Sequence, residues 1–219
     1  MKINIFKKAY LELNPSRSFI FILIVLFFIA CFSPSDPTFQ FSGKDERIKI
    51  IRFIDNYERF INTFAQVTIP IVLGDKIGLV HSAYVGLSTT IITHGFKNLY
   101  NKLGFKFSIR PTGSKSNMPS GHSSMAASGM AFVIRRYGWR FHYSFILIFT
   151  TLGTMFARVE LSKHTLSAVF AGCIVGIFCG YCFASKTREK LSVSFSLNFS
   201  LMRRLFGKTS TTEADKSKS

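Results

Sequence analysis

Two histidines of this chain each follow an arginine closely, in segments that carry other phosphate-binding residue types. The first segment, IRPTGSKSNMPSGHSSM, contains Arg110 and a Ser-Gly-His run at 120–122. The second segment, RVELSKH, begins at Arg158 and ends at His164. Guanidinium groups bind phosphoryl oxygens in bidentate fashion, and imidazoles attack phosphorus or carry protons. These residue types therefore predict a site for phosphoryl chemistry.

The Ser-Gly-His run also marks the expected start of a helix. Ser120 and Gly121 stand where backbone N–H groups and the helix dipole can face an anion, and Gly121 lacks a Cβ that would keep the anion away. Arginine, lysine and N–H donors can neutralise a phosphoryl transition state, so we expect no metal ion and no cofactor. Each residue alone is more often structural, and only the combination is specific.

The composition places this site in a membrane protein. Hydrophobic residues make up 47% of the 219 residues, 25 of which are Phe, and the mean hydropathy is +0.26. This is too apolar for an ordinary soluble domain of this length. The net charge of +17 comes from Lys and Arg between and beyond apolar runs, as in membrane-protein loops, and not from a basic face interleaved with aromatics. We therefore expect a lipid bilayer and a membrane lipid as partners, and no nucleic acid.

Six apolar segments predict an all-α, polytopic membrane bundle in a single domain over residues 1–184. The segment DERIKIIRFIDNYERFI (45–61) predicts an amphipathic helix in the membrane interface before the second span. Residues 185–219 are basic and rich in Ser and Thr, which predicts a partly disordered tail. The expected spans cover about residues 17–33, 59–73, 77–94, 121–134, 143–157 and 165–184.

Six spans place both termini on one side of the membrane. The basic N-terminal head, the 135–140 loop and the tail share that side, which the positive-inside rule makes cytoplasmic. The other side receives residues 34–58, 95–119 and 158–164. The 95–119 loop is basic against this rule, and an anionic ligand would explain the exception. We therefore expect both arginine–histidine segments on the periplasmic face of a bacterial inner membrane.

Arg-Pro at 110–111, Pro-Ser-Gly-His at 119–122 and Arg-x5-His at 158–164 resemble the three-part signature of the phosphatidic acid phosphatase type 2 family. The resemblance implies a six-span lipid phosphatase that works through a phosphohistidine. It assigns His164 as the nucleophile and His122 as the general acid and base. The residues that it assigns to phosphate binding are Arg110, Ser120, Gly121 and Arg158.

The first departure from the family pattern concerns a lysine that normally precedes Arg-Pro. The usual spacing would place it at position 103, which is Leu here. Lys97 is the preferred replacement, because a helix end holds a side chain more firmly than the centre of a loop. Lys102 is the alternative.

The second departure concerns an Asp that normally follows the nucleophilic His. The corresponding residue is Ala168, so another group must hold Nδ1 of His164. Glu160 is a possible orienting residue. Ser162, Ser167 and a backbone carbonyl could also take this role.

Within the family, the chain most resembles the small bacterial lipid A 1-phosphatases, through YERFINTFAQVTIPIV, THGFK and HTLSAVFAG. This implies metal-independent hydrolysis of the 1-phosphate of lipid A, which makes the envelope less anionic and weakens the binding of cationic antimicrobial peptides. A phosphatase for undecaprenyl diphosphate or phosphatidylglycerophosphate, or a lipid phosphotransferase, is an alternative, because the signature recognises phosphate and not the lipid body. A catalytically inactive lipid-binding protein is the alternative from another class; Ala168 keeps it open, but the presence of both histidines and both arginines argues against it.

Overall fold

The described residues of the protein form helices joined by loops. The computed structural model describes residues 4–33, 46–139 and 143–187, and these ranges contain no β-strand. The prediction of an all-α fold is therefore confirmed. The elements are α1 (Ile5–Leu11), α2 (Arg17–Phe32), α3 (Glu46–Val72), α4 (Lys76–Leu103), the 3₁₀ helix η1 (Lys106–Ser108), α5 (Gly121–Tyr137), α6 (Tyr143–Glu160) and α7 (Leu166–Cys182).

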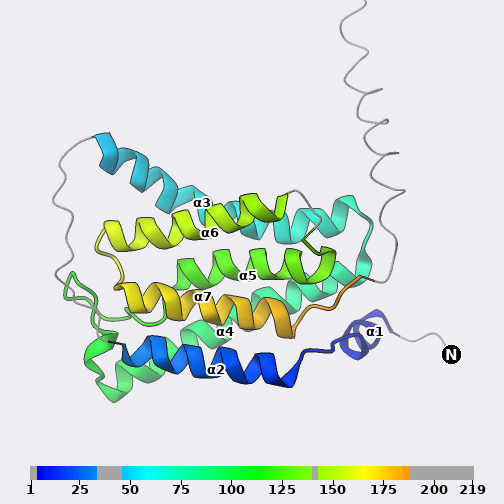
Figure 1. Cartoon of the computed structure of the whole chain (residues 1–219), viewed down its shortest axis with the longest axis horizontal. Helices are drawn as coiled ribbons and strands as arrows, with labels where there is room; N and C mark the ends of the chain where they lie inside the picture. The colour runs from blue at the N-terminus through cyan, green and yellow to red at the C-terminus, as the bar shows by residue number, and fades with distance from the viewer. Residues whose placement is uncertain (1–3, 34–45, 140–142, 188–219) are drawn as a thin grey trace, which may run out of the picture. The chain divides into compact units, whose positions relative to one another are not determined.

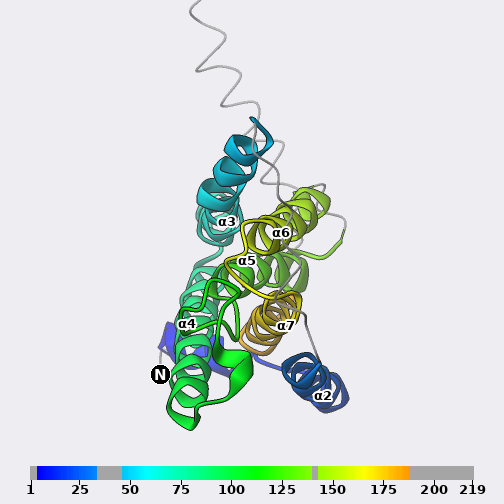
Figure 2. The same cartoon turned by 90° about the vertical axis from the view of Figure 1, so that its left-hand side faces the viewer.

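Helices α2 to α7 form a bundle in which consecutive helices run in opposite directions, from side to side in Figure 1. Helix α5 lies in the middle and contacts α3, α4, α6 and α7, while α2 packs on the outside of α7 (Figure 2). We call the end where α5 and α7 begin the histidine end, because His122 and His164 lie there. The other end, where α5 and α7 finish, is the far end.

Side-chain caps set the starts of the helices that matter for the site. Asp75 accepts a hydrogen bond of 2.8 Å from a backbone N–H in the first turn of α4. Ser120 and Thr165 cap α5 and α7 in the same way. Gly104 ends α4 in the left-handed conformation, with φ of 68°, which favours glycine. The loop between α4 and α5 therefore begins after Leu103.

Helices α5 and α7 approach each other backbone to backbone. Glycines recur at every fourth residue of α7, and a Cβ at any of them would collide with atoms of α5. Such small-residue stripes let two helix axes come close together and are frequent between helices in membranes. The glycines are Gly172, Gly176 and Gly180, and they face the α5 backbone near Ser120, Ser124 and Ser128.

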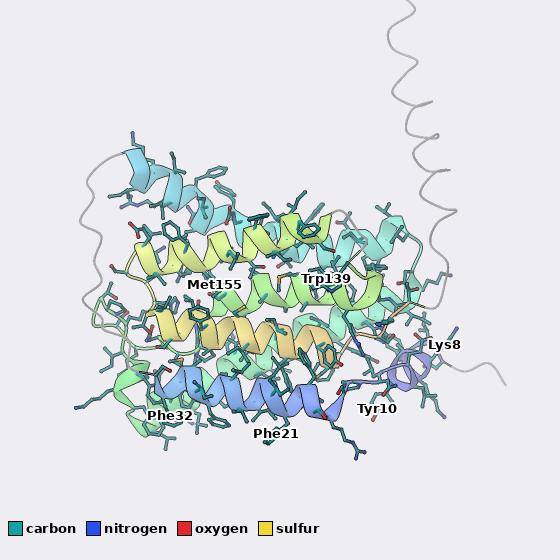
Figure 3. The ribbon with its side chains drawn as sticks, viewed as in Figure 1. Lys8, Tyr10, Phe21, Phe32, Trp139 and Met155 are labelled. Carbon is teal, nitrogen blue, oxygen red and sulfur yellow. The ribbon has the colours of Figure 1, made fainter. Side chains whose placement is uncertain are left out.

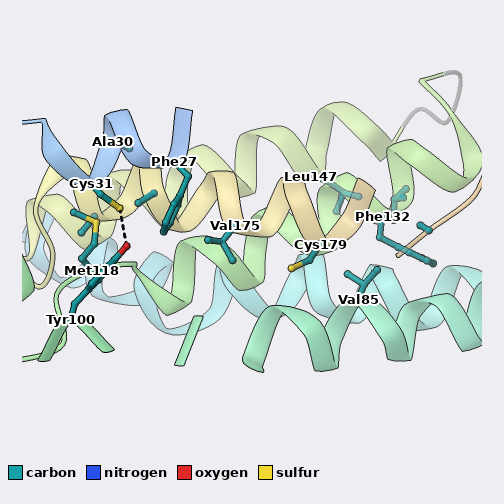
Figure 4. Packing of buried hydrophobic residues seen from close by; sticks show 14 residues of the cluster. Phe27, Ala30, Cys31, Val85, Tyr100, Met118, Phe132, Leu147, Val175 and Cys179 are labelled. Carbon is teal, nitrogen blue, oxygen red and sulfur yellow. Dashed lines mark hydrogen bonds between the residues drawn. The ribbon is translucent and has the colours of Figure 1, made fainter. Parts of the chain in front are cut away.

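The inside of the bundle is mixed in polarity, whereas much of its outside is apolar. Buried apolar side chains such as Phe27, Val175 and Phe132 form a core along the bundle (Figure 4). Asn62 is also fully buried, and its amide donates to the Ala126 carbonyl at 2.8 Å and the Leu147 carbonyl at 3.0 Å, which joins α3 to α5 and α6. By contrast, large apolar side chains such as those labelled on α2 in Figure 3 are exposed.

A buried ion pair closes the far end. Arg136 is 3% exposed and binds both oxygens of Asp75, at 2.6 and 2.7 Å. It also donates to Nδ1 of His81 at 3.4 Å, while Nε2–H of His81 donates to the carbonyl of Ala9 in α1 at 2.9 Å. The ion pair thus connects α1, α4 and α5. The sequence assigns Arg136 to a loop at 135–140, whereas the structure places it in the last turn of α5 with its charge neutralised inside the protein.

Several expected boundaries differ from the structure. The interfacial helix at 45–61 and the second span form one continuous helix, α3, because no residue between them interrupts the helix. Helix α4 extends through residues 95–103, which the sequence pattern assigns to a loop. The start of the expected tail is anchored, because Thr187 N–H donates to the Arg136 carbonyl at 2.9 Å. Residues 34–45 and 188–219, expected to be loop and tail, lie outside the described residues. None of the described helices is both long enough and apolar enough to cross a membrane.

The α5–α7 contact predicts a strong effect of a bulky residue at Gly176. Gly176→Leu should lower the melting temperature in detergent by several degrees, because forced overpacking costs about 1–3 kcal/mol or more. Gly95→Leu is the matched control, since Gly95 is exposed in α4 with no atom near its Cβ position. Equal melting temperatures for the two variants would contradict the close approach of α5 and α7.

Candidate active site

His164 lies in the short turn that joins α6 to α7. Its backbone N–H donates to the carbonyl of Arg158 at 3.2 Å, and the N–H of Lys163 donates to the same carbonyl at 3.1 Å. Ser162 makes the turn possible with a positive φ of 52°. The chain between Arg158 and His164 therefore turns back at the end of α6, which places both residues at the same end of the bundle.

The ring of His164 is buried and held by a main-chain group. Its side chain is 2% exposed, and Nδ1 lies 2.7 Å from the carbonyl oxygen of Asn117. A carbonyl can only accept, so Nδ1 carries the proton and Nε2 keeps its lone pair. Within the described residues Nε2 makes no hydrogen bond. Glu160 is therefore not the group at Nδ1, and a backbone carbonyl takes the place of the family's carboxylate.

The surroundings of His164 keep its imidazole neutral. Burial lowers its pKa most, and the nearby charges of Arg158, Lys97 and Arg110 lower it further, to about 2. A neutral imidazole with an unprotonated Nε2 is the form that can attack an electrophile. The three cations that depress this pKa are the ones that the sequence predicts for phosphate binding, and they converge on this histidine.

Lys97, and not Lys102, is the lysine of this cluster. Its ammonium nitrogen lies 3.5 Å from the position that a Cβ on Gly121 would occupy, so it faces the start of α5. Burial, together with the charges of Arg110 and Arg158, lowers the pKa of Lys97 to about 8. Lys102 is exposed in the last turn of α4 and has no hydrogen bond or ion pair among the described residues.

Asp55 is a site residue that the sequence pattern does not reveal. This carboxylate of α3 is 2% exposed and accepts hydrogen bonds from Nη1 of Arg158 at 2.9 Å and from Lys163 at 2.7 Å. Burial raises its pKa, but the hydrogen bonds from Lys163 and Arg158 outweigh this, so the pKa is lowered and Asp55 is ionised. Nε of Arg158 is buried and has no partner within the described part of the chain. Asp55 thus fixes Nη1 of the Arg158 guanidinium, while the buried Nε–H remains as a hydrogen-bond donor for an anion.

Asn117 is the second site residue that the sequence pattern does not reveal. It is fully buried, and its amide accepts from the N–H of Thr165 at 3.1 Å and donates to Oγ1 of Thr165 at 2.9 Å. The amide also donates to the Phe107 carbonyl at 3.0 Å. The side-chain amide of Asn117 therefore fixes the position of the main-chain carbonyl of the same residue relative to the start of α7. His164 lies just before this helix start.

The remaining predicted residues lie at the start of α5 and in the loop before it. His122 is half-buried in the first turn. Ser120 is fully buried, its N–H donates to the Ala168 carbonyl at 2.9 Å, and its hydroxyl accepts from Ser123. The N–H of Ser120 is thus used to join α5 to α7 and is not available to an anion. Arg110 is half-buried, with Nε and Nη2 each 3.4 Å from the carbonyl of Ser116.

The charges of this cluster favour an anionic ligand. Lys97, Arg110 and Arg158 converge on His164, and Asp55 forms an ion pair with Arg158. Burial strengthens the interaction of these cations with any anion that enters. Among the described residues, no three His, Cys, Asp or Glu side chains lie close enough to hold a metal ion.

Comparison with known proteins agrees with this geometry. The profile of the PAP2 superfamily matches residues 78–191, a segment that contains every cation and histidine of the cluster. The chain belongs to the PAP2 superfamily. Membership in this phosphatase family makes the protein a phosphoric monoester hydrolase, in agreement with the prediction from the sequence motifs.

Three curated relatives extend the similarity over most of the chain. Lipid A 1-phosphatases of two Helicobacter pylori strains are each 34% identical over 192 residues, which are 84% of this chain and 98% and 97% of theirs. A lipid A 4′-phosphatase of Helicobacter pylori is 30% identical over 152 residues, which are 67% of this chain and 75% of that protein. No solved structure matches the chain.

Replacement of Asn117 should impair the chemical step more than substrate binding. Asn117→Ala removes the amide that positions the acceptor for His164, and we expect kcat to fall by about ten- to a hundredfold with little change in KM. Asn98→Ala is the control, because Asn98 is exposed on α4 and does not hold the segment that carries the acceptor. Steady-state phosphate release measures both constants. A change confined to KM would contradict the role of Asn117 in orienting His164.

The low pKa of Lys97 predicts an alkaline limit on activity. Below its pKa of about 8 the ammonium is charged and binds phosphate, and above it the charge is lost, so kcat/KM should decrease. Lys97→Arg keeps its charge and should move this limb to higher pH. Lys102→Arg should leave the profile unchanged. A profile that responds to Lys102 and not to Lys97 would contradict the assignment.

Proposed function

We propose that the protein is an integral membrane lipid phosphatase that removes the 1-phosphate of lipid A through a phosphohistidine at His164. The observation that carries this proposal is the buried, neutral His164, whose Nδ1 is held by a carbonyl and whose imidazole lies near three cations. A bare cation cluster would suffice for binding, whereas an oriented neutral imidazole inside it favours nucleophilic attack. This argues against a catalytically inactive lipid-binding protein.

The choice of substrate rests on the relatives. Two lipid A 1-phosphatases match nearly their full length, and the lipid A 4′-phosphatase matches a shorter part. The 1-phosphate of lipid A is therefore the preferred substrate over other lipid phosphates. Its removal would make the envelope less anionic and reduce the binding of cationic antimicrobial peptides.

In the first step, Nε2 of His164 attacks phosphorus in line with the bond to the sugar oxygen. Protonated His122 donates its proton to that oxygen as the bond breaks. Arg110, Arg158 and Lys97 neutralise the charge on the phosphoryl oxygens, and Nε of Arg158 gains a hydrogen-bond partner. The products are the dephosphorylated lipid and a phosphoryl group on His164.

In the second step, neutral His122 removes a proton from water, and the hydroxide attacks the phosphorus on His164. The P–N bond breaks, inorganic phosphate is released, and the electron pair returns to Nε2 of His164. The carbonyl of Asn117 accepts from Nδ1–H throughout, so the ring keeps its tautomer and orientation. No step requires a metal ion.

A location in the inner membrane is part of the proposal. Exposed phenylalanine, leucine and isoleucine side chains cover the outside of α2 and α6, whereas asparagine, glutamine, serine and threonine are buried inside the bundle. This distribution is expected for helices surrounded by lipid. We propose six spans, with the histidine end on the periplasmic face and both termini in the cytoplasm, following the distribution of Lys and Arg.

The deciding experiment offers purified protein three lipids separately: lipid A, undecaprenyl diphosphate and phosphatidylglycerophosphate. We expect mass spectrometry to show loss of one phosphate from lipid A, at the 1-position, and a rate lower by about a thousandfold or more for His164→Ala, because the nucleophile is gone. His94→Ala is a control, since His94 is exposed on α4. Loss of the 4′-phosphate, or turnover of another lipid alone, would contradict the assignment of the 1-phosphate of lipid A as the substrate. Full activity of His164→Ala would contradict the mechanism.

A further inference from the structure

A groove lies in the far half of the bundle, away from the histidines. This groove has a volume of about 810 Å³ and lies over α5, between α6 and α7. Met130 and Ile134 of α5 line its floor, Leu152 lines the α6 side, and Cys173 and Ile177 line the α7 side. None of the cations around His164 contributes to it.

The shape and lining of the groove suit an alkyl chain. The lining residues of α7 are Cys173, Ile177 and Tyr181, each one turn after the last, so the groove runs parallel to the helix. Eight residues at 1.5 Å per residue give a length of about 12 Å. An acyl chain would therefore lie along the bundle between α6 and α7, with the lipid headgroup at the far end of the bundle.

Two cations at the far end of the groove form no ion pair within the described ranges. Arg135 donates to the carbonyl of Asn14 at 2.8 Å and lies 4.2 Å from the centre of the Tyr181 ring, and both of these groups are neutral. Lys186 lines the same end and is exposed. The guanidinium is thus held in place by neutral groups, with its charge available to a ligand.

Among the described residues, no carboxylate lines the groove. Glu12 and Asp75 lie at the far end of the bundle, but both contact Arg136 and neither belongs to the lining. A headgroup with net negative charge is therefore attracted, whereas an ammonium or choline group would be repelled by Arg135 and Lys186. Trp139 lines the groove beside these cations, as amphipathic rings do at the level of lipid headgroups.

We propose that this groove is a binding site for an anionic glycerophospholipid, with its phosphate at Arg135 and Lys186 and one acyl chain between α6 and α7. The site is separate from the phosphatase site, because it opens at the opposite end of α5 and α7. It depends on the proposed membrane location and not on which lipid is hydrolysed. The ligand is bound and released without any covalent change.

The chain supplies its own probe for this site, because Trp139 is the single tryptophan in the sequence. Phosphatidylglycerol and phosphatidylcholine with brominated acyl chains are titrated into the full-length protein in detergent, and quenching of tryptophan fluorescence is measured. We expect half-maximal quenching at a roughly tenfold lower mole fraction of phosphatidylglycerol, because two cations attract its headgroup. Added salt should reduce this difference.

Arg135→Gln/Lys186→Gln should abolish the difference between the two lipids. Lys186→Gln alone, at an exposed residue, should reduce it and avoids a folding defect. Lys76→Gln is the matched control, since Lys76 is exposed at the start of α4 and does not line the groove. Equal quenching by both lipids, a preference for phosphatidylcholine, or a preference unchanged by Lys186→Gln would each overturn the proposal. Phosphatase activity is assayed in parallel, so failure of either proposal is recognised separately.

Discussion

The close approach of α5 and α7 determines the geometry of the active site. His122 lies in the first turn of α5 and His164 lies just before α7, so the two histidines can cooperate only if these helix starts are neighbours. The glycines of α7 allow this contact, and the hydrogen bond from Ser120 to Ala168 fixes it at the histidine end. Glycines along α7 thus set the relative position of the two histidines.

The cation cluster opposes folding and favours ligand binding for the same reason. Lys97, Arg110 and Arg158 are brought together in a partly buried place, where desolvation and repulsion lower the pKa values of Lys97 and Arg110. Asp55 offsets part of this cost at Arg158, whereas Lys97 and Arg110 contact no carboxylate in the part of the chain that the structure describes. An entering phosphate dianion relieves the repulsion. Binding energy is therefore available before any contact with the lipid chains.

Much of the fold could be predicted from the sequence, because apolar runs and helix caps are local features. The boundaries were less predictable: α3 continues from a charged into an apolar segment without a helix breaker, and Gly95 does not interrupt α4. Motif spacing was sufficient to expect His164 and Arg158 close together, and the structure places both at the end of α6.

Asp55 and Asn117 could not be identified from local pattern. Asp55 contacts Arg158 across 103 residues of sequence, and Asn117 acts through a main-chain carbonyl that every residue possesses. In place of the family's carboxylate, this chain holds Nδ1 of His164 with a neutral acceptor. The carbonyl orients the imidazole but brings no negative charge, so no carboxylate at Nδ1 offsets the charges of the surrounding cations.

The ion pair at the far end has a consequence for biosynthesis. Helix α1 leaves the ribosome first, yet the residue that binds the Ala9 carbonyl, His81, is made 72 residues later. Arg135, which donates to the carbonyl of Asn14, is made 121 residues after Asn14. The N-terminal helix therefore has to wait until more than half of the chain has been translated. Its docking against α4 and α5 can therefore follow only after both of these helices have been made.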